Sequence, residues 1–431
     1  MLELLKQIIL DNQALTLKAG IPRSLEIETI PGKATICMGV RRSGKSTYMS
    51  QIMQRLLDQG VDRANLLHID FFDNRLHNLQ HGDLEQILEA YYSLFPEKKQ
   101  SEKVYCFFDE IQTIENWESF INRLLRAEEC EVYITGSSAK MLSKEIATQM
   151  RGRSLAWEMF PFSFHEFLNL HKIESGPLSS KQRLLINKYF EKYFMNGGFP
   201  EVALIKEHLR IKIHQEYFNT ILFRDLIERH DIKHPKAVMD LAQFLMNNIS
   251  SRHSLRSLYR YLKSLQHNIS PETIAQYLDW FEDAYFLFQI YIYDGSLKRV
   301  HANDKKIYCI DHALVTSVAS GILVNAGHLL ENMIFVALRR LSEKIYYYRT
   351  KNGKEVDFVM ILSEKDRQLI QVCESLADPK TLQREISALE EAMGELNQKT
   401  GTIVTRAEEK KIAVNSGTIH VVPAWKFLLI Q

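Results

Sequence analysis

The sequence predicts an α/β protein whose N-terminal part is a parallel sheet covered by helices on both faces. Five short apolar runs alternate with helical stretches in this part; the runs are 34–40, 66–72, 104–108, 131–136 and 154–160. Strands that alternate with helices favour a parallel sheet, because each parallel pair needs a long crossover connection. Runs that are apolar almost throughout are typical of strands buried on both faces.

The composition narrows the class of protein. Of the 431 residues, 45% are apolar and 25% are charged, which is ordinary for a globular protein and excludes wholesale disorder. Lysine and arginine number 54 against 53 acids, so any nucleic-acid site has to be a local patch. The five cysteines lack C-x-x-C spacing, which predicts neither a zinc site nor a disulfide framework. Without a signal peptide or a long apolar run, we expect a cytoplasmic protein that does not associate with a membrane.

The pattern along the chain changes near residues 160, 250 and 320. Helical periodicity dominates 161–250, which predicts a helical lid or linker after the first domain, 1–160. Strands and helices alternate again in 321–431, and this range is predicted to form a separate small α/β domain.

The range 251–320 has the outline of a winged-helix module. It reads as two short helices, then a third helix that begins at Ser270 and Pro271, then strand-like runs at 285–293 and 305–310. Serine before proline is a favourable pair for the start of a helix. Such modules are common in DNA binding and also serve purely for protein contacts.

A phosphate-binding loop follows the first apolar run. Residues 39–46 read GVRRSGKS, which fits G-x-x-x-x-G-K-[ST] in full, between a strand and a helix as the motif requires. Backbone N–H groups would surround the phosphates of ATP, Lys45 would reach the β and γ phosphates, and Ser46 would bind Mg²⁺. The predicted nucleotide-binding residues are Gly39, Arg41, Arg42, Ser43, Gly44, Lys45, Ser46 and Thr47.

Two carboxylates end another apolar strand. Asp109 and Glu110 follow the run 104–108, where Asp109 would hold Mg²⁺ and Glu110 would orient the attacking water. The alternative is a helix that begins with acidic residues, since these interact favourably with a helix N-terminus. The phosphate-binding loop favours the catalytic interpretation.

Two further features point to the γ phosphate. Ser137 follows the run 131–136 and is predicted to contact the phosphate or the water, whereas its neighbour Ser138 could instead cap the next helix. Arg151 and Arg153 lie at the edge of the predicted domain. An arginine there could stabilise the transition state at a neighbouring subunit's nucleotide, or it could simply face solvent.

Together these segments resemble one family, the prokaryotic AAA-type ATPases that carry a C-terminal domain with a restriction-endonuclease-like core. The segments read GVRRSGKST, FFDEIQTIENW, ITGSSAKML, RGRSLAWEMFPFSFHEF and NGGFPE. The resemblance implies an AAA+ core, hydrolysis of ATP with Mg²⁺, and a homo-oligomer in which Arg153 acts on the neighbouring site. Arg151 remains the alternative.

The resemblance continues through FRDLIERH, GHLLENMIFVALRR and YYYRTKNGKEVDFV. It implies a nuclease-like site in which Glu331 and Asp357 bind a divalent metal ion and a lysine follows on the next strand. Cys373 stands where that lysine is expected. A neutral thiol cannot supply the missing charge. We therefore expect a vestigial metal site in a domain that binds rather than cleaves.

The predicted function is an ATP-driven motor or switch that acts on duplex or branched DNA. The cations that could contact DNA phosphates are Arg252, Arg256, Arg260, Lys263, Lys298, Arg299, Lys305 and Lys306. A solvated helix face would look the same. Two other functions stay open: a nucleotide-dependent switch that binds a protein without DNA, and a metal-dependent nuclease gated by ATP.

Overall fold

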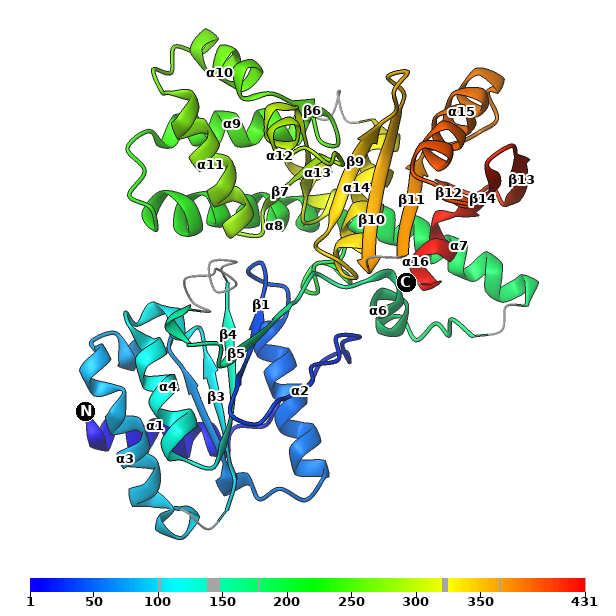
Figure 1. The fold of residues 1–431 in the computed structure, drawn as a ribbon. Coiled ribbons are helices and arrows are strands. Elements are labelled where there is room, and N and C mark those ends of the chain that lie inside the picture. Colours follow the sequence, from blue (N-terminus) through cyan, green and yellow to red (C-terminus); the bar gives the residue numbers. More distant parts are fainter. Residues whose placement is uncertain (100–101, 138–147, 177–178, 320–324, 364–365, 431) are drawn as a thin grey trace. The chain divides into compact units, whose positions relative to one another are not determined.

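The computed structural model describes residues 1–99, 102–137, 148–176, 179–319, 325–363 and 366–430. The chain forms two compact units, Met1–Phe160 and Pro161–Gln431 (Figure 1). Ser138, the candidate helix cap, lies outside the described residues.

The first unit contains a five-stranded parallel sheet in the order β2-β3-β4-β1-β5, so the predicted α/β fold class is confirmed. The strands are β1 (Ala34–Met38), β2 (Leu66–Asp70), β3 (Val104–Asp109), β4 (Cys130–Gly136) and β5 (Ser154–Glu158). The helices are α1 (Leu2–Ala14), α2 (Lys45–Asp58), α3 (Glu85–Leu94) and α4 (Trp117–Ala127), with 3-10 turns at Arg63–Asn65, Asn74–Leu76, His81–Asp83, Pro96–Lys98 and Ile111–Thr113.

Alternation along β3 explains why helices cover both faces of this sheet. Phe107 packs in the cluster that α2 contributes to, and its ring stacks on Tyr133 at 4.8 Å between centroids. The next residue, Phe108, faces the other way and meets Phe120 of α4 at 5.8 Å. Successive side chains of a strand point to opposite faces, so an uninterrupted apolar run fills two cores.

The second unit begins with helices. These are α6 (Phe164–Leu170), α7 (Ser180–Asn196), α8 (Glu207–Thr220), a π-helix (Ile221–Glu228) that continues α8, and α9 (Pro235–Asn247). Two of these helices, α6 and α7, begin with a capping box. In a capping box, a serine and a residue three positions later accept each other's backbone N–H groups. Ser163 pairs in this way with Glu166, and Ser179 with Gln182.

The next elements combine helices with short strands. They are β6 (Arg252–His253), α10 (Leu255–Ser264), α11 (Pro271–Asp283), β7 (Leu287–Ile292), α12 (Leu297–Ala302) and β8 (Lys305–Cys309). With α9 in front, the order is helix, strand, two helices, then two strands, and β8 pairs antiparallel with both β6 and β7. Ser270 caps α11 as predicted. One helix, α10, replaces the two short helices expected before it, because Leu258 and Leu262 form one continuous buried stripe.

The last elements complete a mixed sheet. They are α13 (His312–Val318), α14 (Ala326–Arg339), β9 (Ile345–Arg349), β10 (Glu355–Ser363), β11 (Asp366–Val372), α15 (Pro379–Glu395), β12 (Thr400–Thr405), β13 (Lys410–Val414), β14 (Gly417–Pro423) and α16 (Ala424–Ile430). The nine strands run in the order β13-β14-β12-β11-β10-β9-β7-β8-β6. Parallel pairing of β7 with β9, through Tyr291 and Tyr346, joins β6, β7 and β8 to the C-terminal strands.

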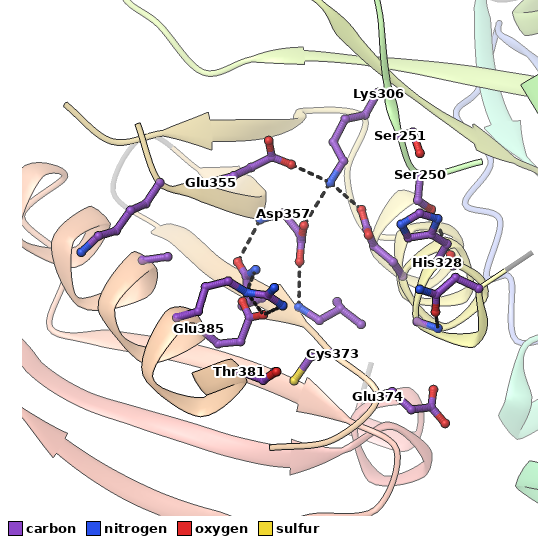
Figure 2. Close-up of a pocket in the computed structure, with 18 of the residues that line it drawn as sticks. Ser250, Ser251, Lys306, His328, Glu355, Asp357, Cys373, Glu374, Thr381 and Glu385 are labelled. Atoms are coloured by element: carbon purple, nitrogen blue, oxygen red, sulfur yellow. Dashed lines mark hydrogen bonds and ion pairs between the residues drawn. The ribbon is translucent and has the colours of Figure 1, made fainter. Parts of the chain in front are cut away.

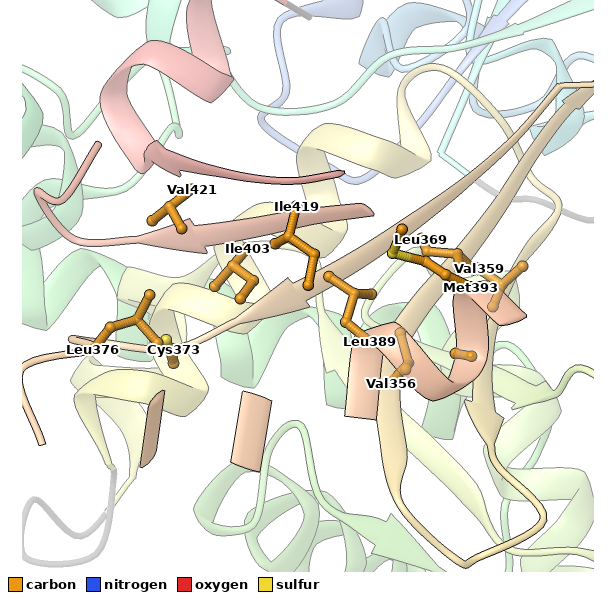
Figure 3. Close-up of a cluster of buried hydrophobic side chains, with 11 residues drawn as sticks. Val356, Val359, Leu369, Cys373, Leu376, Leu389, Met393, Ile403, Ile419 and Val421 are labelled. Carbon is orange, nitrogen blue, oxygen red and sulfur yellow. The ribbon is translucent and has the colours of Figure 1, made fainter. Parts of the chain in front are cut away.

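Helix α15 packs on this sheet through a core of buried apolar side chains (Figure 3). Its Leu389 and Met393 meet side chains of β10 and β12, including Val356 and Ile403. Gly401 allows the close approach, because a Cβ atom there would lie only 2.7 Å from Leu389 Cδ2. Burial of these side chains holds α15 and the strands in fixed register, and Asp357 and Gln371 of the pocket lie on those strands.

Candidate functional site: a nucleotide loop and a charged pocket

The phosphate-binding loop connects β1 to α2 and contains a buried ammonium. Gly44 has φ of 98° and caps α2, a left-handed conformation that favours glycine. The Lys45 side chain is 5% exposed, and its Nζ donates to the carbonyl oxygens of Gly39 at 3.0 Å and Val40 at 3.1 Å. Ser43 Oγ is buried without a hydrogen-bond partner. A buried cation and an unsatisfied hydroxyl in one loop fit a phosphate group.

An arginine absent from the sequence prediction holds this loop in place. Arg23 donates from Nη1 to the carbonyl of Ser43 and from Nη2 to the carbonyl of Phe160, each at 2.6 Å. Its own N–H donates to Gln51 Oε1 on α2. Nothing in the local sequence marks Arg23, because its partners are backbone carbonyls distant in the chain.

The two predicted carboxylates lie where β3 ends, beside β4. Thr135 Oγ1 donates to Asp109 Oδ1 and accepts the backbone N–H of Glu110 at 3.1 Å. Glu110 Oε1 lies 3.9 Å from Lys45 Nζ, and Gln112 donates to Glu110 Oε2. Thr135 therefore fixes both acids through one hydroxyl. The sequence signal that could have found it is a threonine in an otherwise apolar strand beside the acidic one.

A third carboxylate, Asp70, ends β2 in register with Asp109. Burial raises the pKa of Asp70 above its ordinary value, and the charges of Asp109 and Glu110 add to the shift. A cation at this edge of the sheet would lower the repulsion among the three carboxylates of Asp70, Asp109 and Glu110. Ser46 is exposed at the start of α2. The residues present thus fit a nucleotide with Mg²⁺: Lys45 and Ser43 for the phosphates, Ser46 and Asp109 for the metal.

The remaining predicted residues occupy opposite ends of the sheet. Ser137 directly follows β4, on the same edge as Asp109, and is 3% exposed. Arg153 precedes β5, whose first residue pairs with Ala34 at the start of β1. The phosphate-binding loop follows the far end of β1, about 13 Å away at ~3.3 Å per residue. Arg153 Nη1 is buried and lacks a hydrogen-bond partner.

Arg151 is exposed and lies at a surface hollow of about 350 Å³. The hollow is also lined by Arg123 and Arg126 of α4. Cations thus gather near the start of β5, at the end of the sheet away from this subunit's own phosphate-binding loop.

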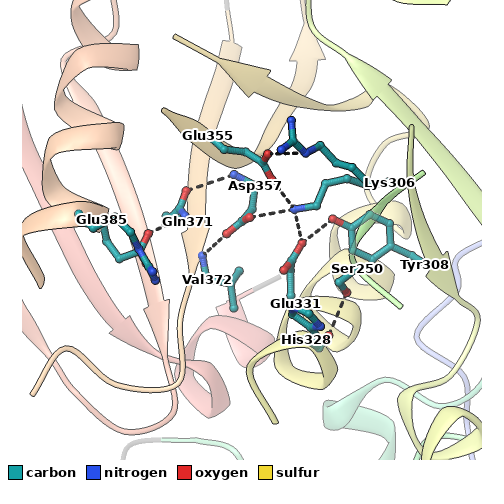
Figure 4. Close-up of polar contacts among 12 residues, drawn as sticks. Ser250, Lys306, Tyr308, His328, Glu331, Glu355, Asp357, Gln371, Val372 and Glu385 are labelled. Atoms are coloured by element: carbon teal, nitrogen blue, oxygen red, sulfur yellow. Dashed lines mark hydrogen bonds and ion pairs between the residues drawn. The ribbon is translucent and has the colours of Figure 1, made fainter. Parts of the chain in front are cut away.

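The second unit contains an open pocket of about 790 Å³ at the carboxylates named by sequence (Figure 2). Glu331 comes from α14, and Asp357 and Glu355 come from β10. Between them lies Lys306 of β8 (Figure 4). Lys306 Nζ is 2.6 Å from Glu331 Oε1 and 3.0 Å from Asp357 Oδ1. It is also 3.1 Å from Glu355 Oε1.

The cluster is buried and strongly coupled. Burial by itself would lower the pKa of Lys306, but the charges of Asp357 and Glu331 outweigh it and hold that pKa well above the ordinary value. Burial raises the pKa of Glu331 above its ordinary value, although Lys306 opposes the shift. The Tyr308 hydroxyl also donates to Glu331 Oε1 at 2.6 Å.

The position expected to hold a lysine carries an inert thiol. Cys373 lines the pocket, and burial raises its pKa to about 12, so the sulfur stays protonated. Gln371 is already engaged: its Oε1 accepts the Asp357 N–H at 3.1 Å, and its Nε2 donates to Glu385 at 2.7 Å. The cation of this site is Lys306, which the sequence assigned to DNA contact. That assignment of Lys306 is wrong, because the side chain is 3% exposed and ion-paired.

The other predicted DNA-contacting cations differ in exposure. Arg256, Arg260 and Lys263 are exposed along α10 at helical spacing, so they share one face. Arg252 forms an ion pair with Glu355 at 3.2 Å. Lys305 packs over the ring of Tyr291 at 4.7 Å.

Helix α11, which follows α10, has four acidic residues and no lysine or arginine. Lys298 and Arg299 are exposed on α12.

In the residues that the structure describes, no three histidine, cysteine, aspartate or glutamate side chains converge as metal ligands would. None of the described helices has the length and apolar character needed to cross a membrane.

Family models match three parts of the chain. Residues 31–168 match a family described as an AAA domain, 187–322 match a domain of unknown function (DUF8612), and 326–427 match another (DUF4143). An uncharacterized protein of Haemophilus influenzae is 30% identical over 75% of this chain and 78% of its own.

Among solved structures, the Aeropyrum pernix ORC1 protein in complex with DNA is similar over 66% of this chain and 86% of its own, with 10% identity and a TM-score of 0.34. AMPPCP-bound DnaA from Aquifex aeolicus covers 65% of this chain and 86% of its own, with 11% identity and a TM-score of 0.27. An uncharacterized protein of Methanocaldococcus jannaschii is 35% identical over 99% of this chain and 95% of its own. This chain therefore belongs to the family of AAA-domain proteins that includes this archaeal relative.

Proposed function

We propose that this protein hydrolyses ATP at the loop between β1 and α2. The observation that carries the proposal is the joint placement of buried Lys45 and the carboxylates of Asp109 and Glu110, which Thr135 holds together. Phosphoryl transfer needs charge stabilisation and an oriented water more than covalent chemistry, and these side chains supply both.

Each residue has a distinct role. Lys45 exchanges its contacts with loop carbonyls for phosphate oxygens, and Ser46 and Asp109 hold the metal ion. Bound Mg²⁺ supplies positive charge to the β and γ phosphate oxygens. Glu110 accepts a proton from the attacking water, and Ser137 lies on the same sheet edge, within reach of the γ phosphate.

We infer that the site is completed by a neighbouring subunit. Arg151 and Arg153 precede β5, at the end of the sheet remote from their own phosphate-binding loop. An arginine placed there can act only on the nucleotide of another copy. The unpartnered Nη1 of Arg153 supports its assignment to this role.

We propose that the ATPase acts on DNA and that α10 provides the DNA-binding surface. Three exposed cations on one helix face suit the regular phosphates of a duplex or branched DNA. A protein partner is the second candidate, and the acidic α11 favours it, because four carboxylates repel phosphate.

The test of the proposed ATPase is turnover in Glu110→Gln and Lys45→Ala. Glu110→Gln removes the base and keeps the metal ligand, so nucleotide binding should persist while turnover falls about 10²–10⁴-fold. Lys45→Ala should weaken nucleotide binding itself. Wild-type turnover in Glu110→Gln would contradict the assignment. Repeating the assay with duplex, single-stranded and branched DNA separates a DNA-stimulated enzyme from one that ignores DNA.

A further inference from the structure

The carboxylates that would bind a divalent ion in the second unit already have a cation. Lys306 Nζ contacts Glu331 Oε1, Asp357 Oδ1 and Glu355 Oε1 at 2.6–3.1 Å. An ammonium has three N–H donors, and here three carboxylates accept them. The side chain is 3% exposed, so it does not exchange these partners for water.

Lys306 and a metal ion compete for the same space. A small divalent ion bonds carboxylate oxygens at about 2.0–2.1 Å. An ion bonded to both Glu331 and Asp357 would sit where Nζ now lies between their oxygens (Figure 4). If Lys306 moved aside, its buried ammonium would lose Glu331 and Asp357 as partners. Only Glu355 would remain, and Glu355 also pairs with Arg252, so the ammonium would be left poorly compensated.

The oxygens that could complete a metal site are engaged elsewhere. Asp357 Oδ2 accepts the N–H of Val372 at 2.9 Å. The Gln371 amide is used on both sides, by Asp357 N–H and by Glu385 (Figure 4). The residues therefore do not fit a divalent ion.

We propose that the Lys306 ammonium permanently takes the place of a metal ion in this pocket, which therefore works without one. Without a metal ion to activate water, the pocket lacks the means to hydrolyse a phosphodiester by the route that the sequence resemblance implies. It instead offers a polar surface for binding. The proposal does not depend on the ATPase, because none of its residues belongs to the nucleotide loop.

The first test is direct binding of Mn²⁺ to the full-length, nucleotide-free protein, followed by electron paramagnetic resonance. Wild type and Asp357→Asn should bind the same amount of Mn²⁺, because Asp357 binds none. The nucleotide loop is intact in both proteins, so any Mn²⁺ bound there contributes equally to both measurements. A wild-type Mn²⁺ site that disappears in Asp357→Asn would overturn the proposal.

The second test removes the ammonium of Lys306 from between the carboxylates. Lys306→Met keeps the length of the side chain and removes its charge, which leaves the carboxylates uncompensated. This variant should melt at a lower temperature than wild type and should gain a Mn²⁺ site, so that Mn²⁺ raises its melting temperature but not that of wild type. Adding Asp357→Asn to Lys306→Met should abolish the gain.

A folded Lys306→Met that binds no more Mn²⁺ than wild type would also overturn the proposal, since the ammonium would then not occupy a metal position. If Lys306→Met does not fold, the comparison of wild type with Asp357→Asn decides alone. That comparison needs no variant of Lys306.

Discussion

A single hydroxyl, that of Thr135, links both acids of the nucleotide site. It donates to Asp109 and accepts the N–H of Glu110, and all three residues are buried. Glu110 has φ of 55°, a conformation that non-glycine residues rarely adopt. Its backbone N–H would lose its partner without the hydroxyl, and an unsatisfied buried donor costs about 1–3 kcal/mol.

Thr135→Val should therefore lower ATP turnover by about tenfold or more, because Asp109 and Glu110 lose their fixed geometry. Nucleotide affinity should change less, since Lys45 is untouched. Thr135→Ser retains the hydroxyl and is the matched control; it should retain most of the activity. Equal turnover in the valine and serine variants would show that the hydroxyl has no such role.

A buried histidine makes the second unit sensitive to acid. His312 is 3% exposed, contacts the carbonyl of Tyr193 through Nε2 at 3.2 Å, and stacks on Phe194. Burial lowers the pKa of His312 below its ordinary value, and the charge of Asp311 only partly opposes this. The folded state therefore binds fewer protons than the unfolded state, whose histidines titrate at about 6.5.

It follows that the stability contributed by neutral His312 is present above about pH 6.5 and declines as the pH falls below that value. His312→Gln keeps an N–H donor but cannot titrate. The melting temperature should fall between neutral and mildly acid pH in both proteins, and the fall should be smaller in the variant. An identical fall in both would assign the acid sensitivity to other groups.

Among the elements, α10 presents the most regular positive face described above. Arg256, Arg260 and Lys263 are exposed, whereas Leu258 and Leu262 on the opposite stripe are buried. The cations therefore take no part in the core, and their replacement should leave the fold intact. This separation allows a clean test of DNA binding.

The variant with Arg256, Arg260 and Lys263 replaced by alanine should lose DNA affinity and show a shallower dependence on salt, by about one unit of slope per lost phosphate contact. Gel shifts at several salt concentrations measure both quantities. Replacing Lys298 and Arg299 on α12 provides the comparison on a second exposed element. Unchanged affinity in the α10 variant would favour a protein partner at the acidic α11.

At the scale of the whole molecule, an arginine that acts between subunits ties activity to assembly. Turnover per subunit should therefore rise with protein concentration. Arg153→Ala should bind ATP and hydrolyse it slowly, by about 10³-fold or more if the arginine stabilises the transition state. Arg151→Ala, two residues away and exposed, is the comparison that decides between the two arginines.

Mixing Arg153→Ala with Lys45→Ala should partly restore turnover, because one of the two kinds of mixed interface joins the intact loop of Arg153→Ala to the intact arginine of Lys45→Ala. Light scattering on the same samples reports the assembly. Full wild-type turnover in a sample that is monomeric throughout would exclude this arrangement.

The nucleotide site could be predicted from the sequence because its signals are local. Residues 39–46 are contiguous, and Asp109 and Glu110 sit together at a strand end. The backbone geometry of such a short motif is enough to form a phosphate-binding loop. The alternation of strands and helices makes the strands parallel, which brings their carboxyl ends to one edge of the sheet. Thr135 and Arg23 were missed because their partners are distant in the chain.

The tertiary structure alone decided the chemistry of the pocket in the second unit. In the sequence, Lys306 is one of two adjacent lysines near a wing, where a charged side chain is ordinarily solvated. Pairing of β7 with both β8 and β9 brings β8 into the sheet that contains β10, and α14 supplies Glu331 from another direction. Whether a lysine becomes an exposed surface cation or a buried counter-ion depends on carboxylates from other elements. No local pattern of residues encodes those carboxylates.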